Sequence, residues 1–134
     1  MTNLDPIQRL LTLTYAYPHS KWDAAKREAL DQLRLIARQP KAKITYSELA
    51  GKITSISFRA DEKPFHTLLG QISVEEHQAG RGMLSVLVVH KSGDLRPGSG
   101  FFELAHLLGH KSRDREKVWS DEFKRVKAAW KTPA

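Results

Sequence analysis

The chain has 134 residues, a length that fits one compact domain and leaves little room for two. Hydrophobic residues make up 40% of it and charged residues 28%, which excludes disorder along the whole chain, and the absence of cysteine excludes disulfides and thiolate chemistry. Lysine and arginine total 22 against 15 aspartate and glutamate, so the net charge of +7 favours a polyanionic partner such as nucleic acid.

No apolar stretch of the sequence is long enough to span a bilayer, and the first residues do not show the basic head and apolar run of a secretory signal. We therefore expect a cytoplasmic protein without a membrane partner. The sequence also shows no internal repeat and no long linker. A single domain over residues 1–134 is expected, with N-terminal helices in 1–40, a core in 41–109 and an amphipathic helix in 110–134.

Two helices are expected before the core. Pro6 suits the first turn of a short helix that ends before Tyr17. Ser20 is the expected N-cap of a long second helix that stops near residue 38, ahead of Pro40. Apolar residues at three- and four-residue spacing predict its buried face, which carries Trp22, Ala25, Ala29, Leu33 and Ile36.

The core opens with a capping box. The hydroxyl of Thr45 can cap the third amide of a helix while the carboxylate of Glu48 reaches back, which predicts a short helix over residues 46–52. Pro64 suits the first turn of another helix over residues 64–72. Residues 53–61 between them are ambiguous and could hold a short strand. Two short helices in this order predict a helix-turn-helix.

Ser73 and Glu76 form a second capping box, which predicts a separate short helix over residues 74–78. Residues 83–89 are β-branched and almost unbroken in apolarity, which is typical of a strand buried on both faces. This strand and the turn after it would supply a wing. We therefore expect an α+β fold, a helix-rich single domain with a winged-helix-like core and one short β-sheet or wing.

Two more helices are expected in the last third of the chain. A glycine-rich approach leads to a helix over residues 101–108, and Gly109 suits the left-handed residue that ends it. The last helix, over residues 114–131, has a basic face opposite an apolar stripe of Trp119, Phe123, Val126 and Trp130. Core packing is the expected role of this stripe, and a protein-interaction module that uses the aromatic helix is the alternative.

Basic residues lie where a winged-helix domain meets a nucleic-acid backbone. They are Lys41, Lys43, Lys52, Arg59, Lys63, Arg81, Lys91 and Arg96. The glycine-rich approach after Arg96 would also point the amides of a helix start at an anion, and a tight turn is the alternative interpretation of the same glycines.

Several motifs follow one another in a fixed order over residues 44–109. They are Ile44-Thr45-Tyr46-Ser47-Glu48-Leu49-Ala50, His66 with Gly70, Val88-Val89, Ser92-Gly93, Gly98-Ser99-Gly100, and the apolar Leu104, Leu107 and Leu108. This order resembles the C-terminal DNA-binding domain of the O6-alkylguanine-DNA alkyltransferases and the alkyltransferase-like proteins. His66 stands where that family has an arginine in its recognition helix. Ser85-Val86-Leu87 stands where it has a reactive cysteine followed by histidine and arginine.

The resemblance implies recognition of DNA without repair, because a serine without an adjacent base is no alkyl acceptor. It implies that Tyr46 contacts or rotates the target phosphate, that His66 fills the gap left by a flipped base, and that Ser85 lies at the pocket.

The sequence thus predicts a non-catalytic protein that binds DNA rather than RNA, with modified or flipped bases as the target. The expected binding residues are Thr45, Tyr46, Ser47, Arg59, His66, Arg81, Lys91, Arg96 and Ser99, with Ser85 at the pocket. No cofactor and no metal is expected. A protein partner or a homodimer stays open.

A small cytoplasmic ribonuclease or toxin is the alternative from a different class. Such an enzyme needs a general base and acid near neutral pH and cations for the phosphate. The candidate groups are Glu75, Glu76, His77, Arg81, His90 and Lys91. This alternative predicts RNA cleavage that is lost when His66, His77 or His90 is replaced by alanine.

Overall fold

Helices account for most of residues 5–131, which are the residues that the computed structural model describes. They are α1 (Pro6–Thr12), α2 (His19–Ala37), α3 (Tyr46–Gly51), α4 (Lys63–Gln78), α5 (Ser99–Leu107) and α6 (Arg115–Ala129). Two short strands, β1 (Ile44–Thr45) and β2 (Val88–Val89), form a parallel pair, and a 3₁₀-helix η1 (Leu84–Leu87) leads into β2. The expectation of a helix-rich single domain with one short sheet is confirmed. Among the described helices, none combines the length and apolarity that a membrane crossing requires.

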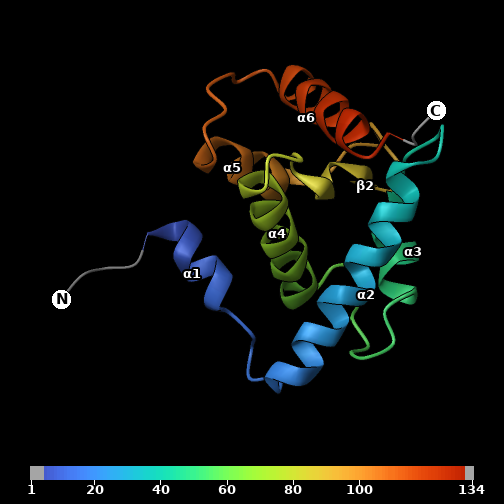
Figure 1. Cartoon of the computed structure of the whole chain (residues 1–134), viewed down its shortest axis with the longest axis vertical. Helices are drawn as coiled ribbons and strands as arrows, with labels where there is room; N and C mark the ends of the chain where they lie inside the picture. Colours follow the sequence, from blue (N-terminus) through green and yellow to red (C-terminus); the bar gives the residue numbers. More distant parts are fainter. Residues whose placement is uncertain (1–4, 132–134) are drawn as a thin grey trace.

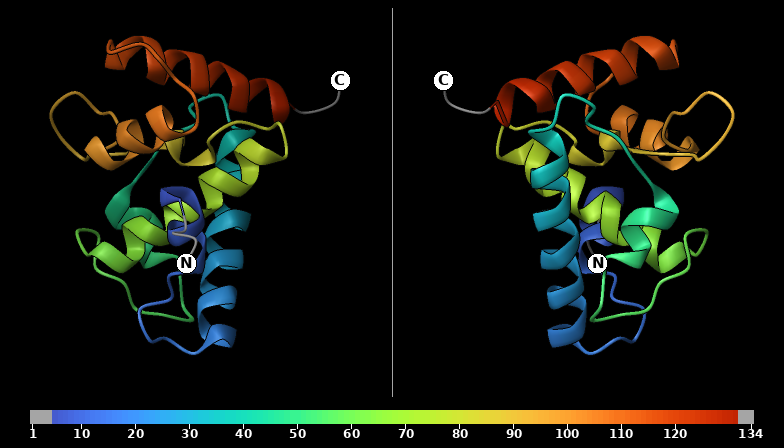
Figure 2. Two further views of the ribbon diagram at one scale, coloured as in Figure 1. Left: turned by 90° about the vertical axis from the view of Figure 1, so that its left-hand side faces the viewer. Right: turned by 90° about the vertical axis from the view of Figure 1, so that its right-hand side faces the viewer.

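The helices pack around α4, which lies between α1 and α2 in Figure 1. Helix α6 lies across one end of α2 and α4, with α5 beneath it (Figure 2). The amino group of Lys127 on α6 ties this end to α2 by donating to the carbonyls of Ala37 and Gln39 at 2.9 and 2.7 Å. The core that results includes Phe65, Leu68 and Ile72 of α4, all of them almost fully buried.

The expected inner face of α2 is largely confirmed. Trp22, Ala25, Ala29 and Leu33 are buried, whereas Ile36 is only partly buried and Ala37 completes the face instead. The expected cap of this helix is wrong, because α2 begins at His19 and Pro18 takes the cap position ahead of Ser20. Proline sets a backbone geometry that suits a helix entrance without a side-chain cap.

The capping box of Thr45 and Glu48 is confirmed. The Glu48 amide donates to the Thr45 hydroxyl at 3.1 Å, and the Thr45 amide donates to the Glu48 carboxylate at 3.2 Å. The loop between α3 and α4 contains no strand, although its apolar side chains Ile56 and Phe58 are buried.

The second capping box is wrong. Helix α4 runs unbroken through Ser73 and Glu76, so no helix begins there. The Ser73 hydroxyl accepts a hydrogen bond from the Ser85 amide at 2.9 Å, and the Glu76 carboxylate accepts two from Arg81 at 2.6 and 3.1 Å. Both side chains therefore serve the segment after α4, because amides inside a helix are already bonded one turn back.

The predicted strand over residues 83–89 is correct only at its end. The whole segment is buried, as expected, but Leu84–Leu87 form a 3₁₀ turn and only Val88 and Val89 pair with β1. A continuous apolar run does not by itself distinguish a buried strand from a buried helical turn.

The amides of this segment explain why it is not a strand. Met83 donates its amide to the buried carboxylate of Glu122 at 3.1 Å, and Val86 donates to the carbonyl of Met83 at 3.0 Å. Ser85 uses Ser73. Buried amides need partners, and here side chains and a local turn supply them in place of a neighbouring strand.

No wing is present in residues 5–131. β1 and β2 are parallel, with Ile44 opposite Val88, and residues 90–98 return as a loop closed by a bond from the His90 amide to the Arg96 carbonyl at 3.0 Å. A wing needs an antiparallel hairpin, so the structure does not show the winged-helix arrangement.

The C-terminal elements follow the expected pattern. Gly109 has a φ of 114°, as a residue just after a helix end requires, although α5 begins two residues earlier than predicted. The Asp114 side chain caps α6 by accepting from the Glu116 amide at 3.0 Å. The aromatic stripe of α6 packs against the core: Val126 is buried, and Trp119, Phe123 and Trp130 are partly buried.

Glu28 of α2 fixes the loop that follows α3. Its carboxylate accepts hydrogen bonds from the amides of Thr54 and Ser55 at 3.1 and 2.9 Å and from the Thr54 hydroxyl. Hydrogen bonds from Ser55, and then from Thr54, lower the pKa of Glu28 from 4.5 to about 2.

We expect Glu28→Gln to reduce the loss of stability in acid. A depressed carboxyl pKa contributes stability that is present above about 4.5 and is lost as the pH falls toward about 2. Urea unfolding measures the free energy of unfolding at about pH 6 and about pH 3. Between these two values it should fall by about 1 kcal/mol less in the variant than in the unaltered chain. The difference is modest because solvent screens this carboxylate. Glu103→Gln, at an exposed site, is the control, and an equal fall in all three proteins would contradict the expectation.

Candidate nucleic-acid interface

A small pocket of about 130 Å³ brings together the three residues that the resemblance singled out. Tyr46, His66 and Ser85 all line it, although they come from the start of α3, the first turn of α4 and η1. The remaining lining is apolar side chains and glycines: Leu10, Leu69, Gly70, Gly98, Gly100, Phe101 and Leu104. The pocket is thus an apolar recess with three polar groups at its wall.

Tyr46 stands at the centre of the site. Its ring stacks on that of His66 with 4.8 Å between centroids, and it lies against the ring of His90 at 5.2 Å. Its hydroxyl accepts a hydrogen bond from the Gly98 amide at 2.9 Å. Burial raises the pKa of Tyr46, so the phenol keeps its proton at neutral pH and has an O–H left to donate.

Gly98 allows this close approach. A Cβ atom at this position would lie 3.2 Å from Nε2 of His90 and 3.6 Å from the hydroxyl of Tyr46. The sequence order marked Gly98 as part of a glycine-rich step, but did not connect it or His90 with Tyr46, because that contact exists only after the 90–98 loop has folded back.

The hydroxyl of Ser85 accepts one hydrogen bond inside the protein and keeps its own proton free to donate. Its Oγ accepts a hydrogen bond from the Ser73 hydroxyl at 2.5 Å, so the proton of Ser85 remains available as a donor. None of the histidines or carboxylates in residues 5–131 bonds to this hydroxyl. Ser85 therefore offers a hydrogen-bond donor and not an activated nucleophile.

His66 is exposed and held in place by the loop before α4. Its Nε2 lies 2.9 Å from the carbonyl of Ala60. A nitrogen that bonds to a carbonyl carries the hydrogen, so in the neutral ring Nδ1 is the acceptor.

A wider cavity of about 460 Å³ shares the Tyr46 and His66 wall with the small pocket. Its other lining residues are Thr45, Ser47, Ala60, Asp61, His90, Lys91 and Ser92. Lys91 is exposed and brings the cationic side chain, while Arg59 nearby pairs with Asp61 at 3.1 Å. Four of the predicted binding residues, Thr45, Tyr46, Ser47 and His66, therefore meet Lys91 at one opening.

Three of the predicted binding residues lie elsewhere. Arg96 makes two hydrogen bonds to Glu116, at 3.0 and 3.1 Å, and stacks 3.7 Å above the ring of Trp119, so it attaches its loop to α6. Arg81 pairs with Glu76 at the other end of α4. Ser99 is exposed as the first residue of α5 and lines neither cavity.

The remaining histidines do not form a second centre. His77 lines a different cavity, near the end of α5. His106 and His110 bond to each other through Nδ1 and a carbonyl at 2.9 Å, and His110 also bonds to the buried Glu122 at 2.6 Å. Within residues 5–131, no three histidine, aspartate or glutamate side chains gather as metal ligands would.

We expect Ser73→Ala to lower the free energy of unfolding, because Ser73 holds Ser85 in the wall of the small pocket. The change removes both the donor to the Ser85 hydroxyl and the acceptor of the Ser85 amide, so an amide is left unsatisfied in the interior at a cost of about 1–3 kcal/mol. Urea unfolding measures this loss. Ser57→Ala, at an exposed serine, is the control, and equal stabilities of the two variants would contradict the assigned hydrogen bonds.

No known protein family, curated protein or solved structure matches this chain. The likeness of residues 44–109 to the alkyltransferase domain therefore remains a hypothesis. The ligand of the chain has to be inferred from the geometry of its own residues.

Proposed function

We propose that this chain binds nucleic acid across the opening formed by Tyr46, His66 and Lys91, and that a ring or alkyl group of the bound strand enters the pocket beside Ser85. The observation that carries the proposal is the convergence of Tyr46, His66 and Ser85 on one recess next to an exposed cation. DNA is the proposed ligand, and recognition without a chemical step is the proposed activity.

The shape of the pocket supports a small aromatic guest. Its volume of about 130 Å³ is close to that of an engineered apolar cavity of about 150 Å³ that admits benzene. Leu69, Phe101 and Leu104 offer apolar walls, while the hydroxyls of Tyr46 and Ser85 offer donors to the edge of a base. A pyrimidine-sized ring, or the substituted edge of a purine, fits such a recess.

The stacked rings of Tyr46 and His66 can offset part of the free energy that base flipping costs. Extrusion of a base costs a few kcal/mol of lost stacking, and an exposed aromatic ring such as His66 can stack in the space that the base leaves. Lys91 lies on the same opening, where a phosphate of the strand would pass.

A gel shift over a salt series tests the proposal. We expect binding that weakens as salt rises, with Lys91→Ala reducing the slope of log K against log salt by about 1 and His66→Ala weakening binding at every salt concentration. Lys124→Ala, an exposed lysine on α6, is the matched control. A flat salt response, or an equal effect of Lys124→Ala and Lys91→Ala, would contradict the proposed interface.

Gly70→Ala separates pocket recognition from general binding. An added Cβ would lie 3.3 Å from a methyl group of Leu10 and would narrow the pocket, while alanine suits the helix. Plain duplex should bind as before, and duplex containing O6-methylguanine should lose any advantage over it. Equal affinity of the unaltered chain for both duplexes would leave a binder that makes no use of the pocket.

The same cavity also supports a second candidate, a ribonuclease. His66 and His90 both pack on Tyr46 and line the wider cavity with Lys91. One imidazole can take the proton of a ribose 2′-hydroxyl while the other protonates the leaving oxygen, and Lys91 can stabilise the charge that develops on the phosphate. His77, which the sequence grouped with these residues, lies apart from them.

Cleavage of a labelled RNA tests this candidate. We expect a bell-shaped pH profile and a loss of about 10²-fold or more in His66→Ala and in His90→Ala, because each removes one partner of the acid–base pair. His77→Ala should cleave at the rate of the unaltered chain. Cleavage that survives the double replacement of His66 and His90 would exclude these histidines as its source.

A further inference from the structure

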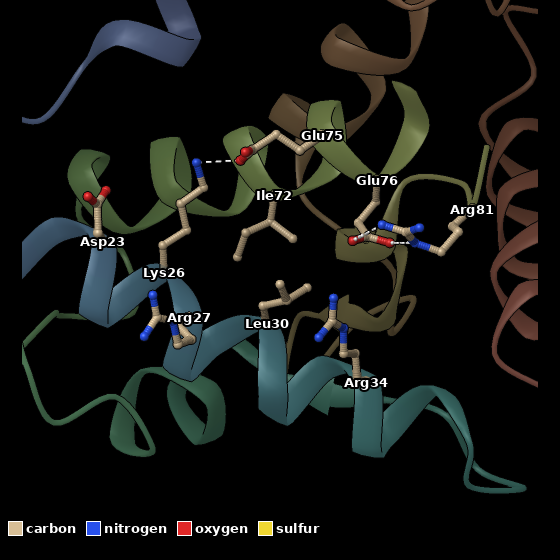
Figure 3. A pocket seen from close by; sticks show the side chains of 9 residues that line it. All are labelled: Asp23, Lys26, Arg27, Leu30, Arg34, Ile72, Glu75, Glu76 and Arg81. Carbon is tan, nitrogen blue, oxygen red and sulfur yellow. Dashed lines mark hydrogen bonds and ion pairs between the residues drawn. The ribbon is translucent and has the colours of Figure 1, made fainter. Parts of the chain in front are cut away.

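A separate groove of about 390 Å³ lies between α2 and the C-terminal half of α4 (Figure 3). Leu30 and Ile72 form its apolar middle, and charged side chains flank them on both sides. Its volume falls in the range of about 300–1,000 Å³ typical of small-molecule sites. The groove shares no lining residue with the pocket beside Ser85.

The groove carries more positive charge than its carboxylates neutralise. Two ion pairs bridge α2, α4 and the segment after α4 here, Lys26 with Glu75 and Arg81 with Glu76. Four cations (Lys26, Arg27, Arg34, Arg81) and three carboxylates (Asp23, Glu75, Glu76) line it, a balance of +1. Within residues 5–131, Arg27 and Arg34 pair with none of these carboxylates.

Three guanidinium groups gather round one indole ring. Arg34, Arg38 and Arg81 lie 5.2, 5.6 and 5.7 Å from the centre of the Trp130 ring. Nε of Arg34 and Nε1 of Trp130 are both buried and meet no acceptor among the described residues. Buried donors without a partner are rare in folded proteins, and Arg34 is the one of the two that lines the groove, so its guanidinium is the candidate donor to an acceptor from outside.

We propose that this groove binds a phosphate monoester, with the phosphate group at Arg34 and Arg81 and the organic part over Leu30 and Ile72. A phosphate monoester carries about −1.5 to −2 charges at neutral pH and three acceptor oxygens. It therefore suits a lining with an excess of positive charge and with guanidinium donors that come from both α2 and the segment after α4. A carboxylate carries one charge, and its two oxygens are satisfied by a single guanidinium. The site is independent of the proposed nucleic-acid interface.

A purely structural role for the arginines makes the opposite prediction. Cation–π contacts with Trp130 would then serve only to attach the end of α6. Replacement of Arg34 would lower stability in that case, and no anion would bind in the groove.

Calorimetric titration with phenyl phosphate, inorganic phosphate and benzoate distinguishes the two. We expect one saturable site, with phenyl phosphate bound more tightly than either of the other two. Arg34→Gln should weaken phenyl phosphate by about tenfold or more, the effect of losing a charged hydrogen bond. Arg113→Gln, at an exposed arginine outside the groove, is the matched control and should leave the affinity unchanged.

Variants at two exposed residues of the groove test the same proposal if Arg34→Gln does not fold. Arg27→Glu should weaken phenyl phosphate and Asp23→Asn should strengthen it, because they change the charge of the lining in opposite directions. The ¹⁵N-labelled Nε–H signal of Arg34 should shift on titration. Absence of binding, equal binding of benzoate and phenyl phosphate, or equal affinities of Arg27→Glu and Asp23→Asn would each overturn the proposal.

Titration with three further phosphate monoesters shows which class of molecule carries the phosphate group that the groove binds. A nucleoside 5′-monophosphate, a hexose 6-phosphate and a 5′-phosphorylated oligonucleotide share the phosphate monoester and differ in the organic group attached to it. All three should lose affinity in Arg34→Gln, and the tightest of them identifies the ligand class. Equal affinity of a nucleoside and its 5′-monophosphate would contradict binding of this group in the groove.

Discussion

Residues 83–89 cross the interior of the molecule, and their amides have to find hydrogen-bond partners there. Met83 uses Glu122 of α6 and Ser85 uses Ser73 of α4, while Val88 and Val89 lie in the parallel pair with β1. One buried segment thereby joins α4, α6 and the sheet. Because β1 runs directly into α3, the same segment also determines where the candidate binding site begins.

The two nucleic-acid hypotheses depend on the same three rings. Tyr46 forms the wall between the small pocket and the wider cavity, and the histidines at positions 66 and 90 lie against it. In a binder they supply a stacking surface beside the cation of Lys91. In a ribonuclease they would exchange protons. The geometry of residues 5–131 serves both uses, so the presence or absence of strand cleavage decides between them.

Local patterns were predictable from the sequence, and patterns completed by distant residues were not. The capping box at Thr45 was correct because both partners lie within one turn. The same pattern at Ser73 was wrong, because a distant segment takes up its hydroxyl. The resemblance placed Tyr46, His66 and Ser85 at one site, and all three do line one pocket. The salt bridge that holds Arg96 on α6 depends on how α6 packs, which no local pattern records.

Helix α1 forms a part of the wall of the small pocket that is less firmly held than the rest. It has no fully buried residue, yet Leu10 lines the pocket, and the carboxamide of Gln71 holds the helix by donating to the carbonyls of Leu10 and Leu13 at 2.7 and 2.8 Å. An element with so little buried surface opens at a lower free energy than the core around it. The size of the pocket is therefore coupled to the local unfolding of α1, and amide hydrogen exchange of this helix would slow once a guest fills the space beside Leu10.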